Sequence, residues 1–178
     1  MNDTTATARA QAAQVRLMAF DVDGVLTDGT LWFTSAGDEM KGFSSTDGHG
    51  LKLLREGGIE LAIITGRRSR AVALRAENLG IARLHQGVED KRAVLLEIAG
   101  QIGVAPQQCG YMGDDVVDLP ILRACGFSAT VPEGEALVKQ HVHYIAHRPA
   151  GRGAVREVCE FILGAQGRLD GLMARYLG

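Results

Sequence analysis

The sequence is poor in features that mark several classes of protein. Only 5% of its 178 residues are aromatic, which leaves few rings for stacking nucleic-acid bases. The formal net charge is −2, whereas nucleic-acid and membrane-surface proteins usually carry excess basic residues. No apolar run approaches a membrane span, and residues 1–14 lack the apolar core of a signal peptide. We therefore expect a cytoplasmic protein that binds neither nucleic acid nor membrane.

Cysteine is also scarce. Cys109, Cys125 and Cys159 are widely separated and form neither a CxxC pair nor a zinc-binding pattern. All three lie in apolar sequence, which favours small core residues with reduced thiols. The rest of the composition, 46% hydrophobic and 22% charged, is that of an ordinary globular chain with a real core. Its length suggests one domain.

Short apolar segments alternate with segments of helical character along the chain. Strands are expected at about 15–20, 59–64, 82–85, 108–112, 126–131 and 141–145, with helices at about 51–56, 69–78, 90–99, 119–122, 133–139 and 156–163. This alternation predicts an α/β fold, with a mostly parallel sheet and helices on both faces. A small β-hairpin is expected at about 30–43, and no segment is long enough for a large cap domain.

The expected domain runs from residue 15 to residue 164. It is preceded by a flexible arm or short helix, residues 1–14, which we place outside the core. It is followed by a tail, residues 165–178. No composition shift or linker marks a second domain.

The first predicted strand ends at two aspartates. Asp21 and Asp23 are one residue apart, so the strand period aims both carboxylates the same way. Like charges this close are unfavourable without a cation or a shared proton, and Mg²⁺ prefers oxygen ligands. One carboxylate can attack a phosphoryl group while the other serves as acid and base. The alternative is a surface turn, because Asp-Val-Asp-Gly also suits a turn.

Three further segments place polar side chains beside predicted strands. Thr65-Gly66-Arg67 follows the second strand, Lys91 opens a helix, and Asp114 follows the fourth strand. Each segment alone has an ordinary explanation, as a strand exit, a solvated lysine or a helix N-cap. Parallel strands end at one edge of the sheet, so these residues can converge with the two aspartates. Their order along the chain favours one shared site.

The expected roles in this site are complementary. Asp21 is the nucleophile and Asp23 the acid and base. Thr65 and the following backbone N–H groups bind phosphate oxygens, and Lys91 offsets the negative charge of the phosphoryl group. The expected Mg²⁺ ligands are Asp21, Asp23 through its backbone carbonyl, and Asp114.

The chain resembles the haloacid dehalogenase-like phosphatase superfamily in four ordered motifs: Asp21-x-Asp23-Gly24-Val25, Thr65-Gly66-Arg67, Lys91 and Gly113-Asp114-Asp115-x-x-Asp118. From Val15 to Asp170 it is similar to one family within it, the 3-deoxy-D-manno-octulosonate 8-phosphate phosphatases. The longer matching stretches are Phe43-x-x-x-Asp47-Gly48-x-Gly50 and Gly151-Arg152-Gly153-Ala154-Val155-Arg156-Glu157-Val158-Cys159. This resemblance implies a Rossmann-like sheet, Mg²⁺, and a hydrolase of a sugar-acid phosphate in lipopolysaccharide biosynthesis.

The resemblance also implies substrate contacts and an assembly. Members form a ring-like homotetramer in which the hairpin packs between subunits and a neighbour covers each active site. Asp115 and Asp118 would support the metal site. By position, the implied substrate contacts are Ser44, Ser45, Thr46, Asp47, Gly48, Lys52, Gly66, Arg67, Arg75 and Arg152.

Two positions bear on which substrate is preferred. Related phosphatases of nine-carbon keto-deoxy sugar acid 9-phosphates tend to carry an acidic residue where this chain has Arg152, and arginine suits the carboxylate of the eight-carbon acid. The alternative is an ordinary arginine in a Gly-rich loop. Thr46 replaces an arginine of the best-known members, which removes one cationic contact.

Two non-enzymatic alternatives stay open at this point. One is a phospho-acceptor that keeps its phosphate without turnover, and the other is a scaffold that retains the fold for assembly. A phospho-acceptor does not need a second carboxylate as acid and base. An inactive scaffold would be expected to have lost Asp21 or Asp23, and both are present.

Overall fold

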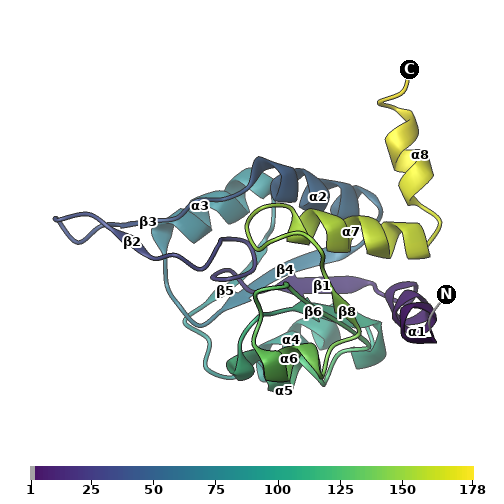
Figure 1. Ribbon diagram of the computed structural model, residues 1–178, viewed down its shortest axis with the longest axis horizontal. Helices are drawn as coiled ribbons and strands as arrows, with labels where there is room; N and C mark the ends of the chain where they lie inside the picture. Colours follow the sequence, from purple (N-terminus) through teal and green to yellow (C-terminus); the bar gives the residue numbers. More distant parts are fainter. Residues whose placement is uncertain (1–2) are drawn as a thin grey trace.

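A parallel sheet forms the centre of this computed structural model, which describes residues 3–178 (Figure 1). Within that range the sheet has six strands in the order β5-β4-β1-β6-β7-β8, and every neighbouring pair is parallel. The strands are β1 (Leu17–Phe20), β4 (Glu60–Thr65), β5 (Arg83–Gln86), β6 (Cys109–Met112), β7 (Phe127–Thr130) and β8 (Tyr144–Ile145). The predicted α/β class is confirmed.

Helices cover both faces of the sheet (Figure 1). One face carries α1 (Asp3–Ala12), α2 (Ser45–Glu56), α3 (Arg70–Leu79) and α7 (Ala154–Ala165). The other carries α4 (Lys91–Gln101), α5 (Leu119–Leu122) and α6 (Ala136–Lys139), and two short 3₁₀ turns, η1 (Pro106–Gln108) and η2 (Val116–Asp118), flank β6.

Strand β1 shows why the sheet needs two apolar layers. Met18 and Phe20 enter the core under α2 and α7, whereas Leu17 and Ala19 enter the core under α4 and α5. Successive side chains of a strand point to opposite faces, so a strand covered on both faces must be continuously apolar. The uninterrupted apolar run in the sequence is the direct result.

The predicted hairpin is present and projects from the body of the molecule (Figure 1). Strand β2 (Trp32–Phe33) pairs antiparallel with β3 (Glu39–Met40). No larger insertion that could serve as a cap occurs in residues 3–178. None of the helices in that range is long and apolar enough to cross a membrane.

Both ends of the described chain pack more closely than expected. Helix α1 lies against α7, and Ala8 and Ala12 are buried in the contact. The expectation of an arm outside the core is therefore corrected for residues 3–12, where small alanine side chains let the two helices approach. In the tail, α8 (Leu169–Ala174) packs Leu169 and Met173 against the core.

Two local details also differ from simple sequence patterns. The N-cap of α2 is Ser44, whose hydroxyl accepts a hydrogen bond from the Asp47 N–H at 3.2 Å. The edge strand expected at 141–145 shrinks to β8, two residues long. His143 precedes that strand, and it contacts buried Ser128 through its backbone N–H, which donates to the Ser128 carbonyl at 3.0 Å, and through its Nδ1, 2.8 Å from the Ser128 hydroxyl.

Candidate active site

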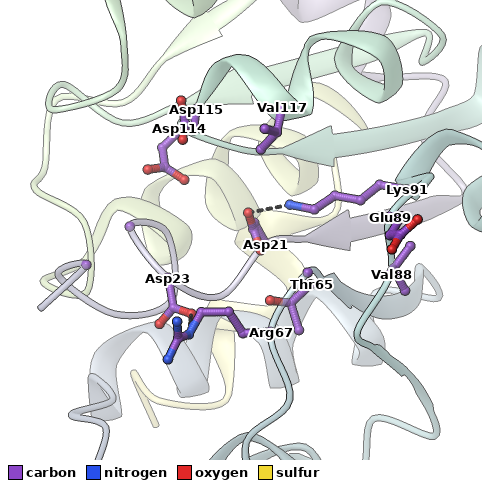
Figure 2. Close-up of a pocket in the computed structure, with 13 residues that line it drawn as sticks. Asp21, Asp23, Thr65, Arg67, Val88, Glu89, Lys91, Asp114, Asp115 and Val117 are labelled. Carbon is purple, nitrogen blue, oxygen red and sulfur yellow. Dashed lines mark hydrogen bonds and ion pairs between the residues drawn. The ribbon is translucent and has the colours of Figure 1, made fainter. Parts of the chain in front are cut away.

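The carboxyl edge of the sheet holds a cavity of about 670 Å³ (Figure 2). Its walls come from the ends of β1, β4 and β6 and from the start of α4. The lining residues are Asp21, Asp23, Gly24, Gly29, Thr65, Gly66, Arg67, Val88, Glu89, Lys91, Asp114, Asp115 and Val117. The structure therefore brings together the four predicted catalytic residues and Asp114.

Strand pairing explains this convergence. Phe20 on β1 is aligned with Ile63 on β4 and with Met112 on β6. The next residue, Asp21, is held by a backbone hydrogen bond of 2.9 Å from its N–H to the Met112 carbonyl. Strands β1 and β6 thus end at the same level and β4 runs two residues further, to Thr65, at the edge where open α/β sheets bind ligands.

Lys91 joins two buried carboxylates. Its Nζ lies 2.6 Å from Asp21 Oδ2 and 2.6 Å from Asp118 Oδ1, and all three side chains are at least nine-tenths buried. Asp21 Oδ1 also accepts a hydrogen bond of 2.7 Å from the Val22 N–H. A buried lysine needs such partners, so the reading of Lys91 as a solvated surface lysine is wrong.

The buried Asp118 carboxylate connects α4 with the loop that follows β6. Besides Lys91, its Oδ1 accepts from the Tyr111 hydroxyl at 3.2 Å. Its Oδ2 accepts from the backbone N–H groups of Asp114 and Asp115, at 3.1 and 3.3 Å. Four donors saturate this carboxylate. It holds Lys91 toward Asp21 and fixes the loop that presents Asp114.

The carboxylates of the site repel one another. Burial, followed by the charge of Asp118, raises the pKa of Asp21 to about 6. Burial, followed by the charges of Asp21 and Asp118, raises the pKa of Asp114 to about 7. Burial lowers the pKa of Lys91, but the two partner carboxylates outweigh it and the net shift is upward. One lysine is too little positive charge for this group of acids.

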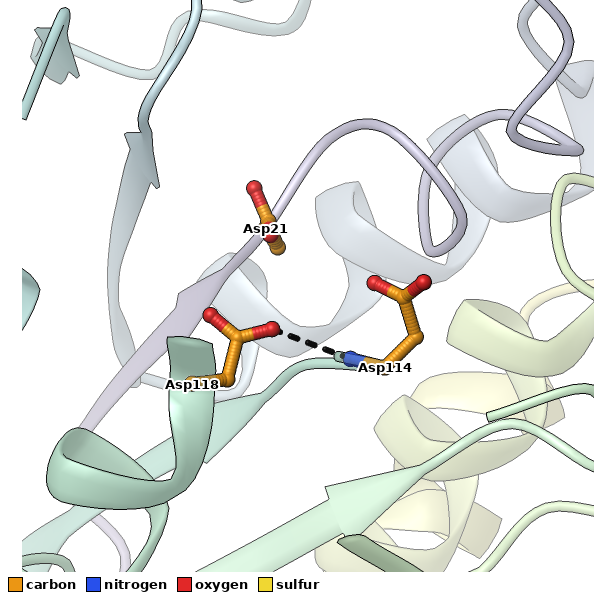
Figure 3. A group of neighbouring side chains, drawn as sticks. All are labelled: Asp21, Asp114 and Asp118. Atoms are coloured by element: carbon orange, nitrogen blue, oxygen red, sulfur yellow. Dashed lines mark hydrogen bonds between the residues drawn. The ribbon is translucent and has the colours of Figure 1, made fainter. Parts of the chain in front are cut away.

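A divalent cation fits this arrangement. Asp21, Asp114 and Asp118 each offer an oxygen, and these oxygens lie within 4.8 Å of one another (Figure 3). Among the described residues, the Asp114 carboxylate accepts no hydrogen bond, whereas Asp118 is fully used. Gly24 leaves room, since a Cβ there would lie 2.1 Å from Asp114 Oδ2. Asp21 and Asp114 are therefore the side chains that fit Mg²⁺.

Figure 2 shows the Asp23 carboxylate beside Arg67 and apart from the carboxylate of Asp114. Lys41 Nζ makes a close ion pair with Asp23 Oδ1, and Arg67 Nε lies 3.5 Å from Oδ2. Glu39 binds both cations, at 3.3 Å from Lys41 and 3.0 Å from Arg67. The Asp23 side chain thus lies outside the group of carboxylates that could hold a metal, and the contact of its backbone carbonyl with the metal stays a prediction.

Glu39 and Lys41 are residues that sequence reasoning missed. They are two apart in an extended segment, so they share one face, and alternation with apolar neighbours was visible. Nothing in the sequence places that face against Asp23.

Some predicted substrate residues lie beside the cavity rather than in it. Gly66 and Arg67 line it, but Ser44 and Arg152 line a smaller neighbouring pocket of about 250 Å³ together with Asp28 and Trp32. Exposed side chains at Ser45, Thr46 and Lys52 line neither pocket, so their contacts stay predictions.

Two residues that were predicted to contact substrate also hold the substrate loop in place. The buried Asp47 carboxylate accepts from the Gly153 N–H at 3.1 Å and the Arg156 N–H at 2.8 Å, at the start of α7. Asp47 thus ties the substrate loop to α7, and its expected contact with substrate stays a prediction. Arg75 donates to the Ser44 carbonyl at 2.9 Å and packs close to Gly48.

Comparison with known proteins gives a consistent result. The KdsC protein of Yersinia pestis, a 3-deoxy-D-manno-octulosonate 8-phosphate phosphatase, is 42% identical over 161 residues, which are 90% of this chain and 86% of that protein. A crystal structure of the corresponding phosphatase from Moraxella catarrhalis, in complex with magnesium ion, phosphate ion and KDO, superposes with a TM-score of 0.93 at 43% identity, covering 95% of this chain and 97% of that one.

A further solved structure extends the likeness to the superfamily. A putative HAD-superfamily (subfamily III A) hydrolase from Legionella pneumophila has a TM-score of 0.93 at 36% identity, covering 98% of this chain and 96% of that one. No protein-family model matches the chain.

Proposed function

Since the chain belongs to the 3-deoxy-D-manno-octulosonate 8-phosphate phosphatase family of HAD hydrolases, we propose that it releases phosphate from that substrate by way of Asp21. It is a phosphomonoester hydrolase with Mg²⁺ as cofactor, acting in lipopolysaccharide sugar biosynthesis. The observation that carries the roles of individual residues is the Asp21 carboxylate, held by Lys91 at the strand end beside Asp114.

In the first half-reaction Asp21 attacks phosphorus. Its carboxylate must be ionised and aimed, and Lys91 supplies both by an ion pair of 2.6 Å. The bond from phosphorus to the sugar oxygen breaks as Asp23 gives that oxygen a proton. Thr65, almost fully buried at the end of β4, and the exposed backbone at Gly66 are placed to bind phosphoryl oxygens.

In the second half-reaction water releases the phosphate. Asp23, now ionised, takes a proton from the water as its oxygen bonds phosphorus, and the bond from phosphorus to Asp21 breaks. Bound Mg²⁺ supplies positive charge that neutralises the carboxylates and the phosphoryl oxygens. Asp21 and Asp114, with the backbone carbonyl of Asp23, would hold it.

We propose that the sugar acid extends from this cavity toward Arg152. The two pockets lie on either side of the loop that follows β1, which contributes Asp23 and Gly29 to one and Asp28 to the other. Arginine can bind a carboxylate through two parallel hydrogen bonds. This supports a sugar acid as substrate, and the acidic residue that the nine-carbon phosphatases tend to carry at the position of Arg152 favours the eight-carbon acid.

We further propose a homotetramer built around the hairpin. Trp32 and Phe33 are 57% and 60% exposed, and Leu31 and Met40 add to the same apolar surface. Isolated hairpins are marginal in water, and apolar patches of this kind mark interfaces. A neighbouring subunit there would also exclude water from the open site. We place the protein in the cytoplasm, which the three free, buried cysteines support.

The deciding experiment measures phosphate release from 3-deoxy-D-manno-octulosonate 8-phosphate with Mg²⁺ and with EDTA. Nine-carbon sugar acid 9-phosphates and common sugar phosphates run beside it. We expect strong preference for the eight-carbon ester, and no release in EDTA. Metal-dependent release with a preference for another ester would overturn the role of Arg152 and leave the proposed reaction mechanism intact. No release from any ester by the folded protein would refute the proposed function.

A further inference from the structure

We propose that Lys41, at the end of the hairpin, is a positioning residue that holds the Asp23 carboxylate where it exchanges its proton. The inference rests on the proposed function, because it takes Asp23 as the acid and base. It adds a residue from outside the four motifs, and it makes the hairpin part of the catalytic apparatus of its own subunit.

The burial of Lys41 is the first observation. Its side chain is 1% exposed, although lysine is almost never buried without partners. Its Nζ has two partners, the carboxylates of Asp23 and Glu39. Burying an ammonium group costs several kcal/mol unless such pairs offset it, so the Lys41 contact strongly restrains the Asp23 side chain.

The second observation is how the two oxygens of Asp23 differ. Lys41 binds Oδ1, whereas Oδ2 is buried and has no hydrogen-bond partner among the described residues. Arg67 Nε lies 3.5 Å from Oδ2, but that side chain is 46% exposed and its charge is screened. One oxygen is thus anchored, and the other is left to carry and accept the proton.

The third observation is that, within residues 3–178, no side chain or backbone group besides Lys41 donates a hydrogen bond to this carboxylate. Asp23 follows the end of β1 in a loop, and the next residue, Gly24, has a positive φ of 80°. Glu39 completes the arrangement by binding both Lys41 and Arg67. Four alternating charges therefore link the loop after β1, the loop after β4 and the hairpin.

This role affects proton transfer rather than phosphoryl transfer itself. Expulsion of a sugar alkoxide needs the proton from Asp23, whereas expulsion of p-nitrophenolate does not, because it is a good leaving group. Hydrolysis of the phosphorylated Asp21 needs Asp23 as base for either ester. Loss of Lys41 should therefore affect the hydrolysis of the two esters differently, whereas a general loss of structure should lower both rates alike.

The test compares Lys41→Met, Lys41→Arg and, as a matched control in the same hairpin, Asp38→Asn, whose exposed side chain does not touch the site. For the sugar phosphate we expect Lys41→Met to lower kcat by about 10²-fold, the low end for general acid–base catalysis, with a much smaller change in KM. With p-nitrophenyl phosphate it should show a burst equal to the enzyme concentration, then slow turnover. Lys41→Arg should recover most of kcat.

A double variant keeps the test decisive if Lys41→Met folds poorly. Asp23→Asn combined with Lys41→Met removes both charges of this pair, and Glu39 keeps its ion pair with Arg67. If Lys41 acts through Asp23, the double variant should be no slower than Asp23→Asn alone.

Three results would overturn the proposal: a wild-type kcat in Lys41→Met, a proportional loss of burst and turnover, or a further 10²-fold loss in the double variant. If the wild-type protein hydrolysed no phosphomonoester, the proposed function would fail instead.

Discussion

Replacing Asp114 by asparagine should stabilise the metal-free protein at high pH while abolishing its activity. Asp114 has a folded-state pKa of about 7, against 3.8 for the free side chain, chiefly because of burial and the charges of Asp21 and Asp118. At pH 4 the folded protein keeps this carboxyl protonated at no cost. Between pH 4 and 7 the unfolded chain ionises while the folded chain keeps the proton, and above pH 7 the folded chain must ionise against its neighbours.

The shift sets the size of the effect. A difference of about 3 pKa units corresponds to about 4 kcal/mol at about 1.4 kcal/mol per unit. Asp114 is partly exposed, so screening reduces this figure, and we expect Asp114→Asn to raise the free energy of unfolding by about 2–4 kcal/mol at pH 8. The gain should disappear at pH 4, where the wild-type carboxyl is neutral.

Urea unfolding followed by far-ultraviolet circular dichroism measures this directly, at pH 4, 6 and 8 in EDTA. Asp38→Asn, an exposed aspartate in the hairpin, is the control for the same chemical change. Added Mg²⁺ should raise the stability of the wild type at pH 8 and have little effect on Asp114→Asn. The reasoning fails if Asp114→Asn is less stable than the wild type at pH 8 in EDTA, or if its gain is equal at pH 4 and 8.

Four other substitutions test separate parts of the site. Asp21→Asn should abolish turnover with an unchanged circular dichroism spectrum, and near-native turnover would remove Asp21 as nucleophile. Lys91→Met should lower the free energy of unfolding at pH 7 by about 3–5 kcal/mol, because two buried carboxylates lose their cation; a loss below about 1 kcal/mol in urea unfolding would contradict this. Asp47→Ala should lower the free energy of unfolding by about 1–3 kcal/mol, because two backbone N–H groups lose their acceptor, and it should raise KM through the loop of Arg152. An unchanged KM would show that Asp47 contributes to stability alone. Phe33→Glu should yield smaller species in sedimentation velocity if the hairpin joins subunits, and an unchanged sedimentation coefficient would reject that interface.

Much of the catalytic centre could be predicted because its residues follow strands directly. Asp21, Thr65 and Asp114 each sit where an apolar run stops, and parallel strands end at one edge. Lys91 was predictable as the first residue of a helix behind the cap Asp90. These patterns are local in the sequence, and the parallel order of the strands brings the residues to one edge of the sheet.

Other features depend on contacts that no local pattern contains. Lys41 reaches Asp23 across 18 positions, and Asp47 binds the start of α7 across more than 100. Either aspartate could equally have faced solvent, substrate or a helix end. The sequence did not predict the contact of Asp47 with α7 for this reason, and the expectation that residues 3–12 lie outside the core was wrong for the same reason.

The sequence by itself determined the α/β class, the hairpin and the polar residues that meet in the cavity, because periodicity and strand-end chemistry act over a few residues. Only the tertiary structure decided which carboxylates are free. It leaves Asp114 unpaired for a metal, saturates Asp118 with four donors, and ties Asp23 to the hairpin. An aspartate is the same letter in all three places, and its neighbours in space set its charge, its pKa and its role.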